Sequence, residues 1–82
     1  MNLNSKITYR EVGDGIIIIT PWDNAMHVLE DVSKDIFNFI LKEKTKDEIL
    51  KEILSIYDIE VDIAKKDLDE FISELTKKEI IL

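Results

Sequence analysis

The chain lacks cysteine altogether and has one histidine, one proline and two glycines among its 82 residues. The absence of cysteine excludes disulfides, iron–sulfur clusters, thiol nucleophiles and cysteine-based zinc sites. Because His27 is the only histidine, a metal site would have to be built largely from carboxylates. The scarcity of glycine and proline predicts that most residues lie in regular helices and strands. We therefore expect neither a metal nor another cofactor.

Long apolar segments are also absent. The longest apolar run, Ile16–Ile19, is far too short to cross a bilayer, and the first residues lack the basic and apolar regions of a secretory signal. Apolar residues nevertheless make up 45% of the chain, which is enough to bury a core. These features predict a single cytoplasmic domain over residues 1–82, with no membrane partner and little room for catalysis.

Positive charge is scarce. Asp and Glu number 18 against 11 Lys and Arg, for a net charge of −7, and Arg10 is the only arginine. An acidic domain repels phosphate backbones unless its bases gather on one face. The composition therefore favours a basic peptide or protein partner over a nucleic acid.

Three strands are expected in the first third of the chain. β-Branched and aromatic residues over residues 6–12, Ile16–Thr20 and Ala25–Leu29 are typical of strands. The Gly13-Asp14-Gly15 segment supplies a hairpin turn, and residues 21–24 supply a second turn. The prediction is an antiparallel β-meander with the isoleucine strand in the middle.

The apolar spacing becomes helical after Glu30, and three helices are expected. Thr45 and Glu48 form a capping-box pattern that opens the second helix, and the third helix runs from about Val61 to Lys78. An apolar tail, residues 80–82, serves as a strand fragment or as a plug against the core. The expected inward residues are Val32, Ile36, Phe37, Ile40 and Leu41 in the first helix, Ile49, Leu50, Ile53, Leu54 and Tyr57 in the second, and Ala64, Leu68, Phe71, Ile72 and Leu75 in the third.

Strands followed by helices predict an α+β fold, with a three-stranded antiparallel meander followed by a winged-helix-like three-helix bundle on one sheet face. Ile16 and Ile18 then face the core, and Ile17 and Ile19 face the other way. Either the N-terminal arm or the tail covers the two outward isoleucines, or they form a surface for self-association as a homodimer.

The third strand is an edge of this sheet. Edge strands are usually protected by charge, proline or a bulge, but Ala25–Leu29 carries none of these, and His27 is its only polar interruption. An extended peptide could pair with this edge and place alternate side chains in a groove beside the third helix.

Three segments together resemble the PqqD-like family, the peptide-recognition elements of ribosomal peptide modification systems. They are the stretch from Val28 to Ile40, the helix start Thr45-Lys46-Asp47-Glu48-Ile49, and the stretch from Leu68 to Leu75. The resemblance covers about residues 7–82. It implies a protein that binds the leader segment of a precursor peptide as a strand added to the third strand. It also implies a partner enzyme such as a radical SAM maturase, a cyclodehydratase or a leader protease.

Carried over by position, the resemblance implies a peptide-binding site that contains Ala25, Met26, His27, Val28, Leu29, Leu68, Phe71, Ile72 and Leu75, flanked by Lys65, Lys66, Asp69 and Glu70. The chain departs from the family in two places. Lys78-Glu79 replaces the usual glycine after the third helix, and Val32-Ser33-Lys34 replaces the usual small residues that open the first helix.

Two other function classes are alternatives to peptide binding. A winged-helix DNA-binding protein needs Lys or Arg at the start of its recognition helix, whereas the third helix begins with Glu60 and Asp62. A structural dimerisation module would use the outward isoleucines. An enzyme is not expected, because the carboxylates of residues 67–74 point in different directions and no nucleophile accompanies His27. The favoured hypothesis is a peptide chaperone without catalytic residues.

Overall fold

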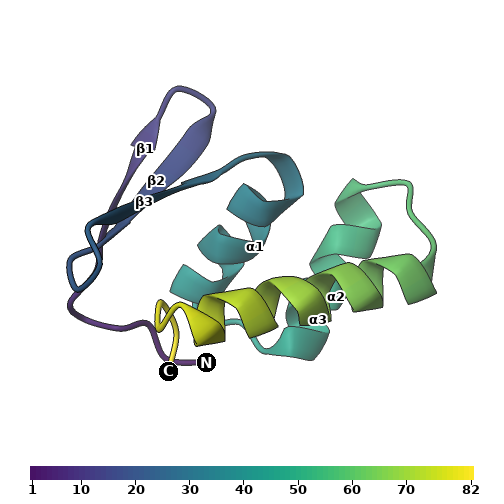
Figure 1. The fold of residues 1–82 in the computed structure, drawn as a ribbon. Coiled ribbons are helices and arrows are strands. Elements are labelled where there is room, and N and C mark those ends of the chain that lie inside the picture. The colour runs from purple at the N-terminus through teal and green to yellow at the C-terminus, as the bar shows by residue number, and fades with distance from the viewer.

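In the computed structural model, which describes residues 1–82, three strands precede three helices. The elements are β1 (Thr8–Val12), β2 (Gly15–Thr20), β3 (Ala25–Leu29), α1 (Asp31–Leu41), α2 (Lys46–Ile56) and α3 (Val61–Lys77). The strands form one antiparallel sheet in the order β1-β2-β3, and the helices lie together on one side of it (Figure 1). The predicted α+β fold, with its meander and its three helices, is confirmed.

The two turns of the meander depend on residues that adopt positive φ. Gly13 has a φ of 60° in the β1–β2 turn and Asn24 has a φ of 53° in the β2–β3 turn. Gly15 is needed for space, since a Cβ atom there would lie 2.9 Å from the carbonyl oxygen of Leu29. β1 begins at Thr8, two residues later than predicted, and Ile7 is buried just outside it.

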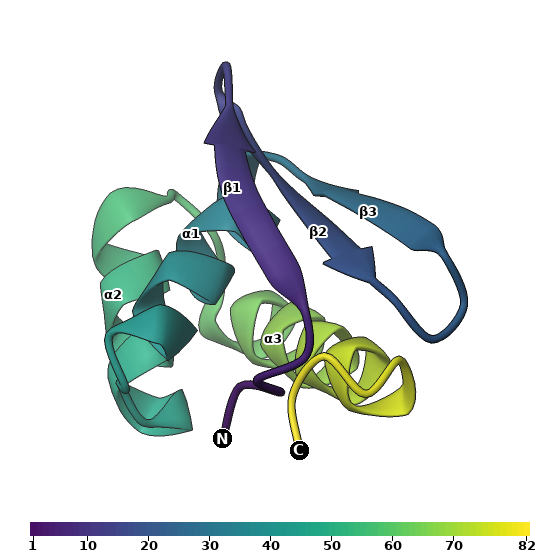
Figure 2. The same cartoon turned by 90° about the vertical axis from the view of Figure 1, so that its left-hand side faces the viewer.

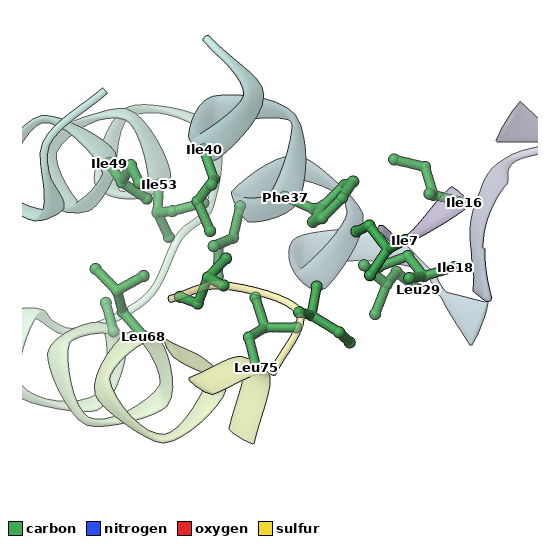
Figure 3. Close-up of a cluster of buried hydrophobic side chains, with 14 residues drawn as sticks. Ile7, Ile16, Ile18, Leu29, Phe37, Ile40, Ile49, Ile53, Leu68 and Leu75 are labelled. Carbon is green, nitrogen blue, oxygen red and sulfur yellow. The ribbon is translucent and has the colours of Figure 1, made fainter. Parts of the chain in front are cut away.

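The core lies between the inner face of the sheet and the helices (Figure 3). Ile16 and Ile18 are buried there, as the alternation along the strand predicts. Phe37 of α1 is fully buried, and the ring of Tyr9 packs edge-on against it with a centroid separation of 5.4 Å. The predicted inward residues of the helices are all buried or packed against this core.

The two ends of the chain pair with each other beneath the sheet (Figure 2). Leu3 and Ile81 form an antiparallel bridge. The Asn4 N–H donates to the Ile80 carbonyl at 2.9 Å, and the Leu82 N–H donates to the Asn2 carbonyl at 2.7 Å. Because Ile80 and Ile81 are also buried in the core, the tail is both a strand fragment and a plug, the two roles predicted for it.

α3 ends as it would with a glycine, although a glutamate occupies the position. The Ile80 N–H donates to the Leu75 carbonyl at 2.9 Å and the Glu79 N–H to the Thr76 carbonyl at 3.0 Å, which is the Schellman pattern. Glu79 therefore has a φ of 60°, a conformation that costs about 1–2 kcal/mol for a residue with a Cβ atom. Glu79, which replaces the usual glycine of the family, therefore preserves the helix ending but holds its own backbone in a strained conformation.

Side chains at the helix ends satisfy free backbone groups and fix the helices. The Thr45 hydroxyl accepts from the Glu48 N–H at 3.2 Å, and the Glu48 carboxylate accepts from the Thr45 N–H at 2.8 Å, so the predicted capping box is confirmed. The Tyr57 hydroxyl donates to Asp35 at 2.5 Å, which ties the end of α2 to α1 and raises the pKa of Tyr57 to about 12. No helix has the length and apolar character needed to span a membrane.

The sheet face that points away from the helices is apolar and open; we call it the outer face. It consists of Val12, Ile17, Ile19, Met26 and Val28 together with the polar Thr8 and Arg10. Ile19 is 41% exposed, Met26 64% and Val28 57%. The expectation that the N-terminal arm or the tail covers the outward isoleucines is therefore wrong, because these segments pair with each other below the sheet instead.

Candidate functional site

β3 is hydrogen-bonded to β2 along one side only, so its other side offers backbone donors and acceptors. The strand Ala25–Leu29 alternates between half-buried or buried residues and exposed ones. His27 faces inward with Leu29, whereas Met26 and Val28 point to the outer face. The edge therefore carries neither Asp, Glu, Lys nor Arg to obstruct an added strand.

A hydrogen-bonded chain fixes the turn that leads into β3. The Thr20 hydroxyl donates to the Asp23 carboxylate, which also accepts from the Ala25 N–H at 3.1 Å. Both hydrogen bonds lower the pKa of Asp23, and the bond from the Thr20 hydroxyl has the larger effect. Because the Thr20 proton goes to Asp23, its oxygen must accept from Nε2 of His27, 3.2 Å away. Neutral His27 therefore keeps its proton on Nε2 and leaves Nδ1 as an acceptor.

Two connected hollows lie beside this edge. The first, here called the edge cleft, has a volume of about 310 Å³ and separates β3 from the C-terminal half of α3. Figure 2 shows this half of α3 below β3, on the side of the molecule away from α2. The edge cleft is lined by His27, Val28, Leu29, Ser33, Phe71, Glu74, Leu75, Lys78 and Ile80.

The second hollow, here called the helix groove, has a volume of about 740 Å³ and lies between the first turns of α1 and the face of α3. It is lined by Val32, Ser33, Ile36, Asp67, Asp69, Glu70, Phe71, Ser73, Glu74 and Lys77. Ser33, Phe71 and Glu74 line both hollows, so the two form one continuous path.

The junction between β3 and α1 positions this path. Asp31 has a φ of 52°, so the chain turns from β3 directly into α1 without a loop. The Ser33 hydroxyl donates to the Glu30 carbonyl at 2.7 Å and accepts from the Glu30 N–H at 3.2 Å. The residues at positions 32–34, which differ from the family pattern, thus form an ordinary first helical turn beside the end of β3.

The structure brings several residues of the predicted site together. His27, Val28, Leu29, Phe71 and Leu75 line the edge cleft, and Asp69 lines the helix groove. Leu68 lines an adjoining apolar pocket of about 360 Å³ among the three helices. Ala25 and Met26 belong to the free edge through their backbone.

Other predicted residues lie elsewhere. Ile72 lies on the other flank of the apolar face of α3, about 100° around the helix from Phe71, where it lines a hollow with Met1 and Lys46. Lys65 is exposed and lies outside the edge cleft and the helix groove.

Sequence reasoning did not assign Val32, Ser33, Ile36, Glu74 and Ile80 to the site. Glu74 carried a usable signal, because it follows Phe71 by three residues and so shares its face of α3, and the same is true of Asp67, which precedes Phe71 by four. The place of Ser33 and Ile80 depends on the β3–α1 junction and on the folded tail, which local patterns do not reveal.

The chemistry of these hollows is that of a binding site. They contain apolar side chains, carboxylates, two lysines and a free strand edge. No three or more His, Asp or Glu side chains converge at a point that could hold a metal ion.

Comparison with known proteins identifies the family of this chain. The family model described as "Coenzyme PQQ synthesis protein D (PqqD)" matches residues 15–81. This chain belongs to the PqqD family. The match includes β2, β3 and all three helices, so every element that borders the two hollows lies inside the PqqD region.

Two solved structures share this PqqD-family fold. One is described as TbiB1 in complex with the TbiA(beta) leader peptide; it is 20% identical, covers 98% of this chain and 93% of its own, and has a TM-score of 0.91. The other is described as lasso peptide synthetase B1 complexed with the leader peptide; it is 17% identical, covers 99% and 95%, and has a TM-score of 0.90. No curated protein matches the chain in sequence.

Proposed function

We propose that this PqqD-family protein binds the leader segment of a ribosomally made precursor peptide as an additional strand on β3. The observation that carries the proposal is the uncharged edge of β3 beside the edge cleft. An added strand would form main-chain hydrogen bonds with β3 and direct alternate side chains into the cleft. Membership of the PqqD family and the two similar structures, both described as complexes with leader peptides, support it.

The two parts of the site do different work in this proposal. A ladder hydrogen bond contributes only about 0.5–1.5 kcal/mol net, whereas a fully buried aliphatic or aromatic anchor contributes about 1.5–3 kcal/mol. The β3 edge therefore sets the register of the peptide. Phe71 and Leu75, which line the cleft from α3, set most of its affinity.

The protein acts as a peptide chaperone in this proposal and has no catalytic step of its own. It presents the precursor to a separate modifying enzyme in the cytoplasm, such as a radical SAM maturase, a cyclodehydratase or a leader protease. Covalent catalysis needs a nucleophile beside a base, and the side chains that line the edge cleft form no such pair.

The test uses the short open reading frames that neighbour the gene. Synthetic peptides for their N-terminal segments are titrated into ¹⁵N-labelled protein, and the backbone amide shifts are followed by NMR. Binding should shift the amides of Ala25–Leu29 first, followed by those of Phe71 and Leu75. Shifts that cluster on α2 would place the site elsewhere and contradict the proposal.

Self-association is a second candidate, because the outer face exposes Ile19, Met26 and Val28. A homodimer that buries this face should dissociate when Ile19→Lys is introduced, and sedimentation velocity of both proteins measures the outcome. DNA binding is not favoured, because α3 opens with the acidic Glu60 and Asp62 and nucleic-acid readers place basic residues there.

A further inference from the structure

The helix groove extends the peptide site beyond the end of β3. Ser33, Phe71 and Glu74 line both the helix groove and the edge cleft. Leu29 is the last residue of β3 and also lines the edge cleft. A strand paired with β3 that continues past Leu29 therefore enters the helix groove, which at about 740 Å³ has room for several side chains.

The walls of the helix groove are acidic. Four carboxylates, from Asp67, Asp69, Glu70 and Glu74, face a single lysine, Lys77. Asp69 is paired with Lys46 of α2, and Glu74 is 4.0 Å from Lys78. Asp67 and Glu70 form no ion pair. They are three residues apart on α3 and so lie on one face of the helix.

The floor of the helix groove is apolar. Ile36 is buried, and Val32 and Phe71 are half-buried, so these side chains form a hydrophobic base below the carboxylates. Lysine and arginine have long aliphatic stems that pack on apolar surface while the charged head reaches polar groups. An apolar floor below two unpaired carboxylates matches the shape and the charge of such a side chain.

We propose that the helix groove binds a Lys or Arg side chain of the peptide, with its stem on Val32, Ile36 and Phe71 and its head at Asp67 and Glu70. This proposal rests on the proposed function, because it concerns the part of the same peptide that lies beyond Leu29. It defines the substrate class as leader segments with an apolar anchor for the edge cleft and a basic residue a few positions away.

The test starts from a phage-displayed library of random 16-residue peptides selected on the wild-type protein. NMR shifts at Ala25–Leu29 identify the selected peptides that bind at β3. In these peptides Lys and Arg should be enriched at a fixed distance from an apolar residue. A Lys→Gln change in such a peptide should weaken binding to the wild type about three- to tenfold, the range expected for one or two partly exposed ion pairs.

Two matched protein variants locate the effect. In Asp67→Asn/Glu70→Gln the Lys and Gln peptides should bind equally well. Glu11→Gln/Asp14→Asn removes the same two charges from exposed positions in β1 and its turn, and should preserve the preference for Lys. Both variants change exposed side chains only, and circular dichroism checks their folding.

The outcomes separate the two proposals. The basic subsite is wrong if the selected peptides shift the β3 amides but show no enrichment of Lys or Arg. It is also wrong if the Lys→Gln change lowers affinity equally for the wild type and for Asp67→Asn/Glu70→Gln. Either result leaves β3 pairing intact. Selected peptides that leave the β3 amides unshifted overturn the proposed function, and the subsite with it. A selection that yields no binder overturns both.

Discussion

The two edges of the sheet are built differently. β1 is exposed at all five positions and carries Arg10 and Glu11, whose charges oppose the approach of another strand. β3 lacks such charges and lies beside the edge cleft and α3. Charged side chains thus protect one edge of the sheet and leave the other unprotected, and this difference supports the proposal that a peptide pairs with β3.

Proline substitution is the most severe way to test this difference. Successive N–H groups of a strand point to opposite sides, so one of His27→Pro and Val28→Pro removes an outward donor and the other a donor to β2. The variant that stays folded should lose about a hundredfold or more in peptide affinity, since proline removes a donor and its ring obstructs the ladder. Fluorescence anisotropy with a peptide that shifts β3 measures the loss.

Arg10→Pro in β1 is the matched control for the proline variants. Once folding is confirmed by circular dichroism, its affinity should equal that of the wild type. Equal losses from folded β1 and β3 variants would show that the peptide does not distinguish the two edges.

Neighbouring residues of α3 provide the second test. Phe71 lines both the edge cleft and the helix groove, whereas Ile72 is half-buried on the other flank of the apolar face of α3 and lines neither of them. Phe71→Ala should weaken peptide binding about ten- to a hundredfold, because a buried anchor contributes about 1.5–3 kcal/mol. Ile72→Ala should reduce stability with little change in affinity. Calorimetric titration and urea denaturation of both variants separate these effects.

Relief of strain below the edge cleft should change stability while preserving binding. Glu79→Gly removes a left-handed conformation that only glycine adopts without cost. The free energy of unfolding should rise by about 1 kcal/mol, because glycine's extra entropy in the unfolded chain offsets part of the 1–2 kcal/mol of strain. Urea denaturation measures this gain, and an unchanged or lower stability would contradict the role assigned to Glu79.

Removing the charges of β1 should make the two edges more alike. Arg10→Val/Glu11→Val creates a second apolar, uncharged edge, and edge strands of that kind pair with other chains. Weak self-association, with a Kd on the order of 100 μM or above, should appear in sedimentation velocity. The charge-preserving variant Arg10→Lys should behave like the wild type.

The smallest expected effect concerns the turn before β3. A carboxyl whose pKa is lowered by folding stabilises the folded state above its unfolded pKa of 3.8, and this stabilisation is lost as the pH falls through the lower folded pKa. Asp23→Asn should therefore increase amide exchange at Ala25 severalfold at about pH 5, and the difference should shrink as the pH falls below 3.8 and through the lowered pKa of Asp23. A difference that persists in acid would assign the protection to another group.

Local patterns predicted most of the fold. The meander, the capping box at Thr45 and the inward isoleucines follow from alternation, turn residues and helical spacing, all of which act between near neighbours in the chain. The same patterns left the cover of Ile17 and Ile19 open, because it depends on where the distant N-terminal arm and tail go. In the fold these segments pair with each other, and Ile19 remains exposed.

The candidate site was less predictable than the fold. The free edge of β3 followed from strand order and composition. Helical spacing predicted that Phe71 and Leu75 face inward, and the resemblance to the PqqD family implied their place in the site. The apolar pattern correctly predicted that Phe71 and Ile72 both pack against the core, but the two side chains lie on different flanks of that face and line different hollows. The contribution of Ser33 required knowledge of the positive φ at Asp31, a conformation that Asp adopts only occasionally.

The pairing of Leu3 with Ile81 has a practical consequence for engineering. Since Leu3 and Ile81 lie side by side, a short linker could join the two ends of this domain, and the chain could be reopened at the exposed Gly13-Asp14 turn. Such a circular permutant would keep every strand and helix while moving the attachment point of a fluorescent reporter to the far end of the sheet. A domain with adjoining termini is thus a natural starting point for a genetically encoded sensor.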